Sequence, residues 1–328
     1  MNSSINKSKI RHSIGIITYN QENYLEDAID WILEGELDNV YEIIVSDDCS
    51  HDNTPSVIEK YTRLIGPKFK KNINKENLGI SENINIIRNS FSGNVLTLVA
   101  GDDFCSSGLI EKINEEIISR RLDPEKDLFI FSPAVTEINK QKKIIAKFMN
   151  GSLKKDQFVS LAVRHKLYKT EVGMSKALVD ALGNFEERVD ADYGIFSDFF
   201  DYVKLFSLVD EIIIINEHSY FHRDGVGVTS KPGTIPHWES YNLVADQLIE
   251  CRDELKLSKK DVIYLEWQKL NHIILNRKNL LSLAKSAPYA IYLFIFDPLS
   301  RDVITKSYFN YVKLFYRLVK KITKKKFP

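Results

Sequence analysis

Cysteine is scarce in this chain, and its spacing excludes two kinds of site. The 328 residues include three cysteines, Cys49, Cys105 and Cys251, and no C-x-x-C pair. An odd number of widely separated cysteines favours neither a disulfide framework nor a thiolate zinc site. Isolated thiols are typical of proteins in a reducing compartment, so we expect a cytoplasmic location.

Long apolar stretches are also missing. The longest, APYAIYLFIF at residues 287–296, is broken by Pro288 and is about half of the ~20 residues that a membrane-spanning helix needs. Residues 1–13 lack the apolar segment of a secretory signal peptide. We therefore expect no segment that crosses a membrane.

The sequence has no excess of charge of either sign, with 45 Lys and Arg residues against 45 Asp and Glu residues. Nucleic-acid-binding proteins gain much of their affinity from surplus basic residues that neutralise phosphates, so we expect no nucleic-acid partner. A composition of 44% hydrophobic and 27% charged residues is typical of a globular protein. A chain of this length forms one large domain or two.

The sequence does contain an alternation of short apolar runs and helical patterns. Runs that predict strands cover residues 13–19, 41–46, 69–73, 95–100, 128–131 and, further on, 209–216. Helical spacing is found at residues 24–33, 55–65, 80–90 and 109–118. This alternation predicts an α/β fold with a mostly parallel central sheet flanked by helices. Residues beyond 236 follow helical patterns, so we predict two parts, 1–235 and a C-terminal helical region at 236–328.

Polar residues gather where three predicted strands end. They are Thr18, Tyr19 and Asn20 after the first strand, Asp47 and Asp48 after the second, and Asp102 and Asp103 after the fourth. Loops at the carboxyl ends of strands form the ligand crevice of open α/β sheets. Acidic pairs on one rim repel each other unless a cation or hydrogen-bond donors lie between them, and Mg²⁺ prefers one or two carboxylates plus phosphate oxygens. The pattern favours a metal-bridged diphosphate, although such acids also make turns or cap helices.

With these motifs the sequence resembles a known family, the inverting glycosyltransferases of family 2 with the GT-A fold. The resemblance covers residues 13–115 and rests on the ordered stretches IITYNQENYLEDAID, EIIVSDDCSHDNT and NKENLGISENINIIRNSFSGNVLTLVAGDDF. It implies that Tyr19 and Asp48 hold the nucleobase and ribose of a nucleotide sugar, with Thr18, Asn20 and Asp47 beside them in the donor site.

The same resemblance implies a divalent metal, Mn²⁺ or Mg²⁺, at the second acidic pair. Asp102 and Asp103 would contact the ribose and donor sugar and bind the metal, chiefly through Asp103. The family's motif usually reads Asp-x-Asp, whereas Ala100 stands at its leading position here. That departure puts the ribose contact of the missing carboxylate in question.

The resemblance also implies a general base in the stretch DADYGIFSDFF, residues 190–200. We expect Asp192 to take the proton of the acceptor hydroxyl, because an aromatic residue follows it as in the family motif. Asp190 is the alternative, since Ala191 replaces the Glu of the family. The competing interpretation is an Asp that only caps a helix starting near Tyr193.

The later segment YFHRDGVGVTS, residues 220–230, resembles the family's loop over the donor diphosphate. It implies that His222 completes the metal site and that Arg223 neutralises phosphate. A histidine in a glycine-bearing loop also fits a plain surface residue. The glycines argue against a zinc pair of His218 and His222.

Residues 306–326 carry eight Lys and Arg residues and no Asp or Glu, and their apolar residues follow helical spacing. This profile predicts an interfacial helix attracted to anionic lipid, which would place the protein at the inner face of the cell membrane. The alternative is a helix packed on the domain with a solvated lysine end.

The function that the resemblance implies is sugar transfer with inversion. The donor would be a nucleotide sugar, UDP-linked by family habit, and the acceptor a hydroxyl of a glycan or a lipid-linked saccharide, as in bacterial polysaccharide assembly. A metal would stabilise the leaving diphosphate while a carboxylate takes the hydroxyl proton. Two alternatives stay open: a nucleotidyltransferase, and a non-catalytic sugar-nucleotide-binding protein, since Ala100 and Ala191 replace expected acids.

Overall fold

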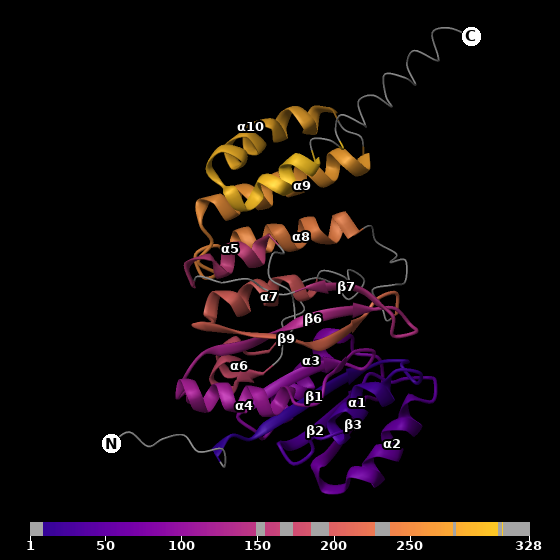
Figure 1. The fold of residues 1–328 in the computed structure, drawn as a ribbon. Helices are drawn as coiled ribbons and strands as arrows, with labels where there is room; N and C mark the ends of the chain where they lie inside the picture. The colour runs from indigo at the N-terminus through magenta and orange to yellow at the C-terminus, as the bar shows by residue number, and fades with distance from the viewer. Residues whose placement is uncertain are drawn as a thin grey trace, which may run out of the picture. The chain divides into compact units, whose positions relative to one another are not determined.

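The computed structural model describes residues 9–148, 155–164, 173–184, 197–226, 237–277, 280–307 and 310 (Figure 1). These residues form two compact units that interleave along the chain. The first unit holds the described residues up to Lys155, those of 173–184 and those of 204–226; the second holds 156–164, 197–203 and the described residues from 237 onward.

A five-stranded sheet forms the base of the first unit, with the order β3-β2-β1-β4-β8. Its strands are β1 (His12–Thr18), β2 (Val40–Asp47), β3 (Phe69–Ile73), β4 (Val95–Ala100) and β8 (Met174–Ser175). The first four run parallel, and β8 pairs antiparallel with β4. The central strands β1 and β4 are almost entirely buried, as expected for a parallel sheet whose two faces are covered.

The helices between these strands have the expected amphipathic character. They are α1 (Leu25–Leu33), α2 (Thr54–Ile65), α3 (Ile80–Ser90), α4 (Leu109–Arg120) and α6 (Lys176–Leu182), with the short η2 (Gly66–Lys68) after α2. Pro55 lies in the first turn of α2, where a missing backbone N–H costs nothing. The prediction of a mostly parallel α/β fold flanked by helices is confirmed.

A second sheet in the same unit has the order β5-β9-β6-β7. It consists of β5 (Phe104–Cys105), β6 (Phe129–Ile138), β7 (Ile144–Phe148) and β9 (Glu211–Arg223). One apolar core joins the two sheets, since side chains from β1, β4, α4, β6 and β9 pack together in it.

Strand β9 corrects the sequence-based prediction that its strand ends at residue 216. The strand continues to Arg223 because β6 and β5 pair with its second half, including Glu137 with His222 and Phe104 with Phe221. His222 and Arg223 therefore lie on a strand, and not on a glycine-bearing loop. Consecutive strand residues point to opposite faces of a sheet, so these two side chains have different surroundings.

The second unit is helical. It contains α5 (Phe158–Val163), α8 (His237–Glu250), α9 (Lys259–Arg277), α10 (Leu280–Phe296) and η6 (Pro298–Ser300), while η3 (Lys155–Gln157) and α7 (Ser197–Leu208) continue from one unit into the other. Helix α9 packs against both α8 and α10. None of the helices in the described parts of the chain combines the length and the apolar composition needed to cross a bilayer.

A buried ion-pair network joins the helices of this second unit. The Arg164 guanidinium, after α5, contacts Asp261 on α9 and lies 2.7 Å from Asp297 Oδ2 at the start of η6. All three side chains are almost fully buried. Removing one partner of such a network leaves an uncompensated buried charge, so the network fixes how α5, α9 and η6 pack.

Candidate functional site

The three polar clusters that follow β1, β2 and β4 meet at one edge of the first sheet. Thr18 is paired with Asp47, and Ile17 is paired with Ala100, so the three strands end at the same level. The turns continue this alignment: Asp48 N donates to Thr18 O at 2.9 Å, and Gly101 N donates to Ile17 O at 2.8 Å. The polar residues predicted to form a crevice therefore do come together.

Gly101 is required for the close approach of β4 to the turn after β1. A Cβ atom at this position would lie 2.4 Å from Gln21 Oε1 and 2.9 Å from Thr18 Oγ1. Both of these oxygens are buried and find no hydrogen-bond partner within the described part of the chain. Buried polar atoms without a protein partner are uncommon, and these two lie beside the strand tips where the donor site is predicted.

The loops after β1 and β2 are joined by reciprocal hydrogen bonds. Asn20 N donates to Ser50 Oγ at 2.8 Å, and His51 N donates to Asn20 Oδ1 at 2.8 Å. Asn20 is exposed and has a left-handed φ of 53°, while Tyr19 is half-buried. Both predicted donor-binding residues thus stand on a loop that the neighbouring strand's turn holds in place.

Asp47 makes the turn after β2. Its side chain is fully buried and accepts a hydrogen bond from Ser50 N at 3.1 Å and another from the Ser50 hydroxyl. Burial raises the pKa of Asp47. This geometry corresponds to the turn-making alternative, and it does not favour a direct donor contact by Asp47.

Asp48 anchors the segment between β3 and α3. One carboxylate oxygen accepts from Asn74 Nδ2 at 2.9 Å and from Leu78 N at 2.8 Å, and the other accepts from Gly79 N at 2.9 Å. The residue is only 4% exposed. In this arrangement Asp48 shapes the wall of the site, and the geometry does not favour the predicted direct contact to ribose or base.

Asp103 lies in the turn after β4 and connects this turn to β9. Its carboxylate accepts hydrogen bonds from the Tyr220 hydroxyl at 2.9 Å and from Arg223 N at 2.8 Å, and His222 Nδ1 lies 3.2 Å from it. Asp103 is 4% exposed. Since three groups already share its two oxygens, Asp103 is placed to orient β9 and is poorly placed to be the principal metal ligand.

Asp102, the neighbouring acid, has a different environment. Its side chain is half-buried, and burial together with the Asp103 charge raises its pKa to about 6. Raised values of this size are common where a site is built to receive a cation or a proton. Asp102 is thus the acid of the pair whose charge has least compensation from the protein.

His222 is held with one ring nitrogen toward Asp103. Its side chain is 43% exposed, and the hydrogen bond to Asp103 raises its pKa. A carboxylate that fixes Nδ1–H leaves Nε2 as the nitrogen that can act as a ligand. His222 thus lies beside Asp103 on a strand, and its role as a metal ligand stays a prediction.

The predicted metal ligands do not form a complete site by themselves. Within the described ranges, no group of three or more His, Cys, Asp or Glu side chains is arranged to hold an ion. The predicted set of Asp102, Asp103 and His222 is therefore not a preformed cage. A cation held here would have Asp102 and His222 as its protein ligands and would take the remaining ligands from phosphate oxygens and water.

Arg223 lies on the opposite side of β9 from His222 and is 3% exposed. Its guanidinium donates to Asp27 Oδ2 at 2.8 Å and to the Asp102 carbonyl at 3.0 Å, and it stacks 4.7 Å from the Tyr24 ring centre. The geometry does not favour the predicted phosphate contact. Arg223 instead ties β9 to α1 and to the turn that carries Asp102.

Asp27 was not identified from the sequence and is a central residue of this arrangement. Burial alone would raise its pKa, but hydrogen bonds from Lys142 and Arg223 lower it. Lys142 Nζ lies 2.7 Å from Asp27 Oδ1, and Arg223 binds the other oxygen. In the sequence Asp27 is an acid in the first turn of a predicted helix. An acid at this position is normally explained by its favourable interaction with the helix dipole.

The predicted bases, Asp190 and Asp192, lie outside the described residues. Their roles therefore stay predictions.

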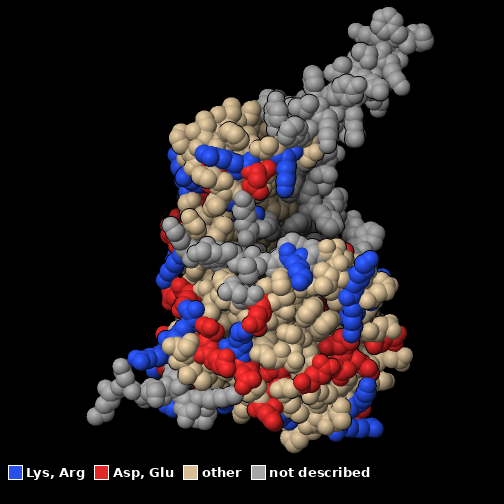
Figure 2. Space-filling view, viewed as in Figure 1, with Lys and Arg blue, Asp and Glu red and all other residues tan. Residues whose placement is uncertain are grey.

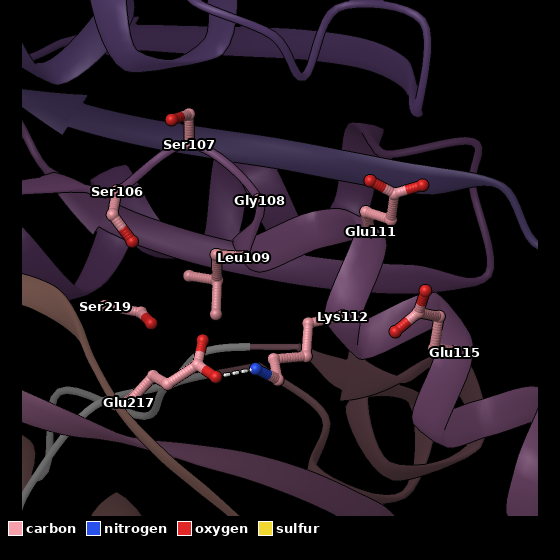
Figure 3. Close-up of a pocket in the computed structure, with 9 residues that line it drawn as sticks. All are labelled: Ser106, Ser107, Gly108, Leu109, Glu111, Lys112, Glu115, Glu217 and Ser219. Atoms are coloured by element: carbon pink, nitrogen blue, oxygen red, sulfur yellow. Dashed lines mark hydrogen bonds and ion pairs between the residues drawn. The ribbon is translucent and has the colours of Figure 1, made fainter.

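A small polar pocket lies beside the first turn of α4 (Figure 3). Its volume is about 170 Å³, less than the ~300–1,000 Å³ of typical ligand sites. It is lined by Ser106, Ser107, Gly108, Leu109, Glu111, Lys112, Glu115, Glu217 and Ser219. Lys112 pairs with Glu217 across it. None of the predicted site residues lines this pocket.

Comparison with known proteins identifies the family. The profile described as Glycosyl transferase family 2 matches residues 13–169. The chain carries a family 2 glycosyltransferase domain. This confirms the resemblance found in the sequence motifs.

Solved structures show that this family 2 domain has the GT-A fold. TarS 1-349 of S. aureus, crystallised in complex with UDP-GlcNAc, superimposes with a TM-score of 0.60 and 16% sequence identity, over 96% of this chain and 92% of that one.

Relatives in sequence match over shorter stretches. Glycosyltransferase GlyA of Streptococcus pneumoniae is 25% identical over 223 residues, which is 66% of this chain and 31% of GlyA. An uncharacterized protein of Mycobacterium tuberculosis, Rv1520, is 30% identical over 105 residues, 32% of this chain and 30% of that protein. The matches thus span about a third of the length of these relatives.

Proposed function

We propose that the protein is an inverting glycosyltransferase that moves a sugar from a UDP-sugar to a hydroxyl of a glycan or a lipid-linked saccharide. The observation that carries this proposal is the meeting of Asp102, Asp103 and His222 at the strand tips of a family 2 domain. The complex of TarS with UDP-GlcNAc supports the class of donor, and a hexose or N-acetylhexosamine is the sugar to test first.

The two adjacent acids divide the work at this site. Asp102 presents the carboxylate for a divalent cation, Mn²⁺ or Mg²⁺, because its charge is the less compensated. Asp103 acts as a positioning residue that holds His222 Nδ1, so that Nε2 would be the nitrogen available to a cation. When bound, the cation would neutralise charge that develops on the leaving diphosphate.

The donor nucleotide lies, in this proposal, along the tips of β1 and β4. Thr18 and Gln21 have buried oxygens with no partner among the described residues, and Tyr19 and Asn20 stand on the adjoining loop. Asp48 supports the site indirectly, by fixing the segment before α3.

Proton removal from the acceptor is assigned to Asp192, with Asp190 as the alternative. Inversion requires a base on the face of the sugar opposite to the leaving diphosphate, and a carboxylate is suited to it. Residues 1–235 would supply donor binding and catalysis, and residues 236–328 the acceptor side. A reaction at the cytoplasmic face of the membrane suits a lipid-linked acceptor.

The proposal is tested by a screen of nucleotide sugars for release of nucleoside diphosphate, with Mn²⁺, with Mg²⁺ and with chelator. We expect release from one UDP-sugar that chelator abolishes and that Asp102→Asn reduces by at least ~100-fold. The matched control is Asp253→Asn, since that side chain is 96% exposed, and it should leave the rate unchanged.

Two other outcomes would contradict the proposal. Donor binding without turnover on any acceptor would favour the non-catalytic alternative. Formation of pyrophosphate from a nucleoside triphosphate and a sugar phosphate would favour a nucleotidyltransferase.

A further inference from the structure

Helix α10 has one side that its described neighbours cover and another side that carries large exposed apolar side chains. Its inner side is formed by Ser286, Leu293 and the following Asp297, which are all buried, and the helix packs there against α9. The apolar side of a helix is normally buried against another element. We therefore expect the outer side of α10 to bind a partner.

The outer side carries a cluster of large exposed side chains. Thirteen large apolar side chains are strongly exposed in the described part of the chain, and five of them lie within residues 289–296. They are Tyr289 at 36%, Ile291 at 61%, Phe294 at 48%, Ile295 at 54% and Phe296 at 55%, and we call them the α10 patch. Scattered exposed apolar residues are ordinary, but a contiguous group marks an interaction surface.

The spacing places most of the α10 patch on one stripe. Ile291, Phe294 and Ile295 follow one another at i, i+3 and i+4, which lie on the same helix face. Pro288 and Ala287 extend this stripe by one turn and are also exposed. Tyr289 and Phe296, seven residues apart, lie together beside this stripe, so the α10 patch combines aliphatic and aromatic side chains, an arrangement suited to the boundary between water and lipid.

Basic groups stand at both ends of the α10 patch. Lys285 is exposed at one end. At the other end Arg301 donates from Nε to the Phe294 carbonyl at 2.9 Å and from Nη2 to the Ile295 carbonyl at 3.2 Å. In Figure 2 blue Lys and Arg side chains lie beside the tan surface of the C-terminal helices, with a red acidic side chain between them.

The surrounding charge is predominantly positive. Within residues 285–307 the acids are Asp297, which is buried against Arg164, and Asp302, which is exposed. The sequence from 306 to 326 then adds eight Lys and Arg residues and no acid. A partner for the α10 patch should hence combine an apolar interior with a negatively charged surface.

We propose that the α10 patch docks the protein onto a bilayer that contains anionic phospholipid, with its side chains inserted at the level of the acyl-chain boundary. Lys285 and Arg301 would then meet the phosphate groups. A second copy of the chain is disfavoured as the occupant, because pairing two such patches brings two basic surroundings together. This docking surface is independent of the chemistry proposed above.

The test is co-sedimentation of the full chain with vesicles of phosphatidylcholine alone and of an equal mixture of phosphatidylcholine and phosphatidylglycerol. Binding should require phosphatidylglycerol and weaken with salt. The variant Ile291→Gln/Phe294→Gln/Ile295→Gln should bind the mixed vesicles at least ~10-fold more weakly, because its apolar contact with the bilayer is removed. Glutamine keeps the helix propensity high, and exposed positions leave the fold intact.

The matched control is Leu64→Gln/Ile144→Gln/Ile145→Gln, which removes apolar side chains of similar exposure, 62%, 54% and 52%, from other surfaces. It should bind vesicles like the unaltered chain. A bromolipid in the mixed vesicles should quench the fluorescence of Phe294→Trp.

Three results would overturn the proposal. The first is equal vesicle binding by the α10 variant and the unaltered chain, which would assign the attraction to residues 306–326 alone. The second is the absence of binding to either vesicle. The third is an oligomer, measured by light scattering, that the α10 variant converts to a monomer while vesicle binding is unchanged.

Discussion

Replacing either acid of the Asp102–Asp103 pair by asparagine should change stability in opposite directions. For Asp102, a pKa raised from 3.8 to about 6 means that the charged form is disfavoured in the folded protein. The shift corresponds to about 3 kcal/mol at most, and partial exposure reduces it, so Asp102→Asn should stabilise the metal-free protein by roughly 1–2 kcal/mol near neutral pH.

Asp103→Asn should instead destabilise the protein. The Asp103 carboxylate accepts from Tyr220, His222 and Arg223 N, and an amide offers one acceptor oxygen and a donor that faces other donors. Loss of hydrogen bonds to a charged, buried group costs about 2–4 kcal/mol.

The sign of the pH dependence separates the Asp102 effect from a general loss of charge. The pKa of Asp102 is higher in the folded protein than in the unfolded chain, so Asp102 keeps its proton to a higher pH in the folded protein. Below about pH 4 Asp102 is protonated in both states and does not destabilise the fold. Between about pH 4 and pH 6 the destabilisation by Asp102 grows as the pH rises. Urea unfolding in chelator at several pH values measures this. The gain from Asp102→Asn should disappear near pH 4. A loss of stability in Asp102→Asn at neutral pH, or equal losses in both variants, would refute the division of roles.

Three further predictions follow from the same contacts. Mn²⁺ affinity, followed by calorimetry, should fall by up to ~10-fold per pH unit below about pH 6, since the metal competes with the proton on Asp102; a flat profile from pH 7 to 5 would exclude Asp102 as a ligand. Gly101→Ala should cost about 1–3 kcal/mol in urea unfolding, because its Cβ meets Thr18 at 2.9 Å, and an unchanged midpoint would mean that the turn yields freely. Asp192→Asn should abolish transfer with donor affinity unchanged, whereas Asp190→Asn should retain activity; the reverse pattern would exchange their roles.

The sheet of the first unit could be predicted because its determinants are local. Runs such as VLTLVA in β4 are apolar throughout, and amphipathic helices separate them. Parallel strands with such connections end at the same edge, so the meeting of the polar turns after β1, β2 and β4 followed from the order of the elements alone.

The length of β9 could not be predicted, because its second half is held by distant partners. The segment EHSYFHR has mixed polarity and is followed by glycines, which locally favours a loop. It becomes a strand through pairing with β6 and β5, and the β5 partners lie more than a hundred residues earlier in the chain.

The different roles of Asp102 and Asp103 were beyond sequence reasoning for the same reason. The contact of Asp103 with Tyr220 joins residues 117 apart. Neighbouring identical acids look alike in a motif, and only the packing of β9 shows which one has its charge already compensated. The ion pair between Arg223 and Asp27 likewise depends on the packing of α1 against β9, which the sequence does not reveal.

The most direct test of the central claim is a calorimetric titration of uridine diphosphate into the protein with Mn²⁺, into the protein with chelator, and into Asp102→Asn with Mn²⁺. A cation shared between the strand-tip acid and a diphosphate predicts clear binding in the first titration and at least ~10-fold weaker binding in the other two. Equal affinity in all three would contradict the claim that these strand tips hold a metal-bridged nucleotide.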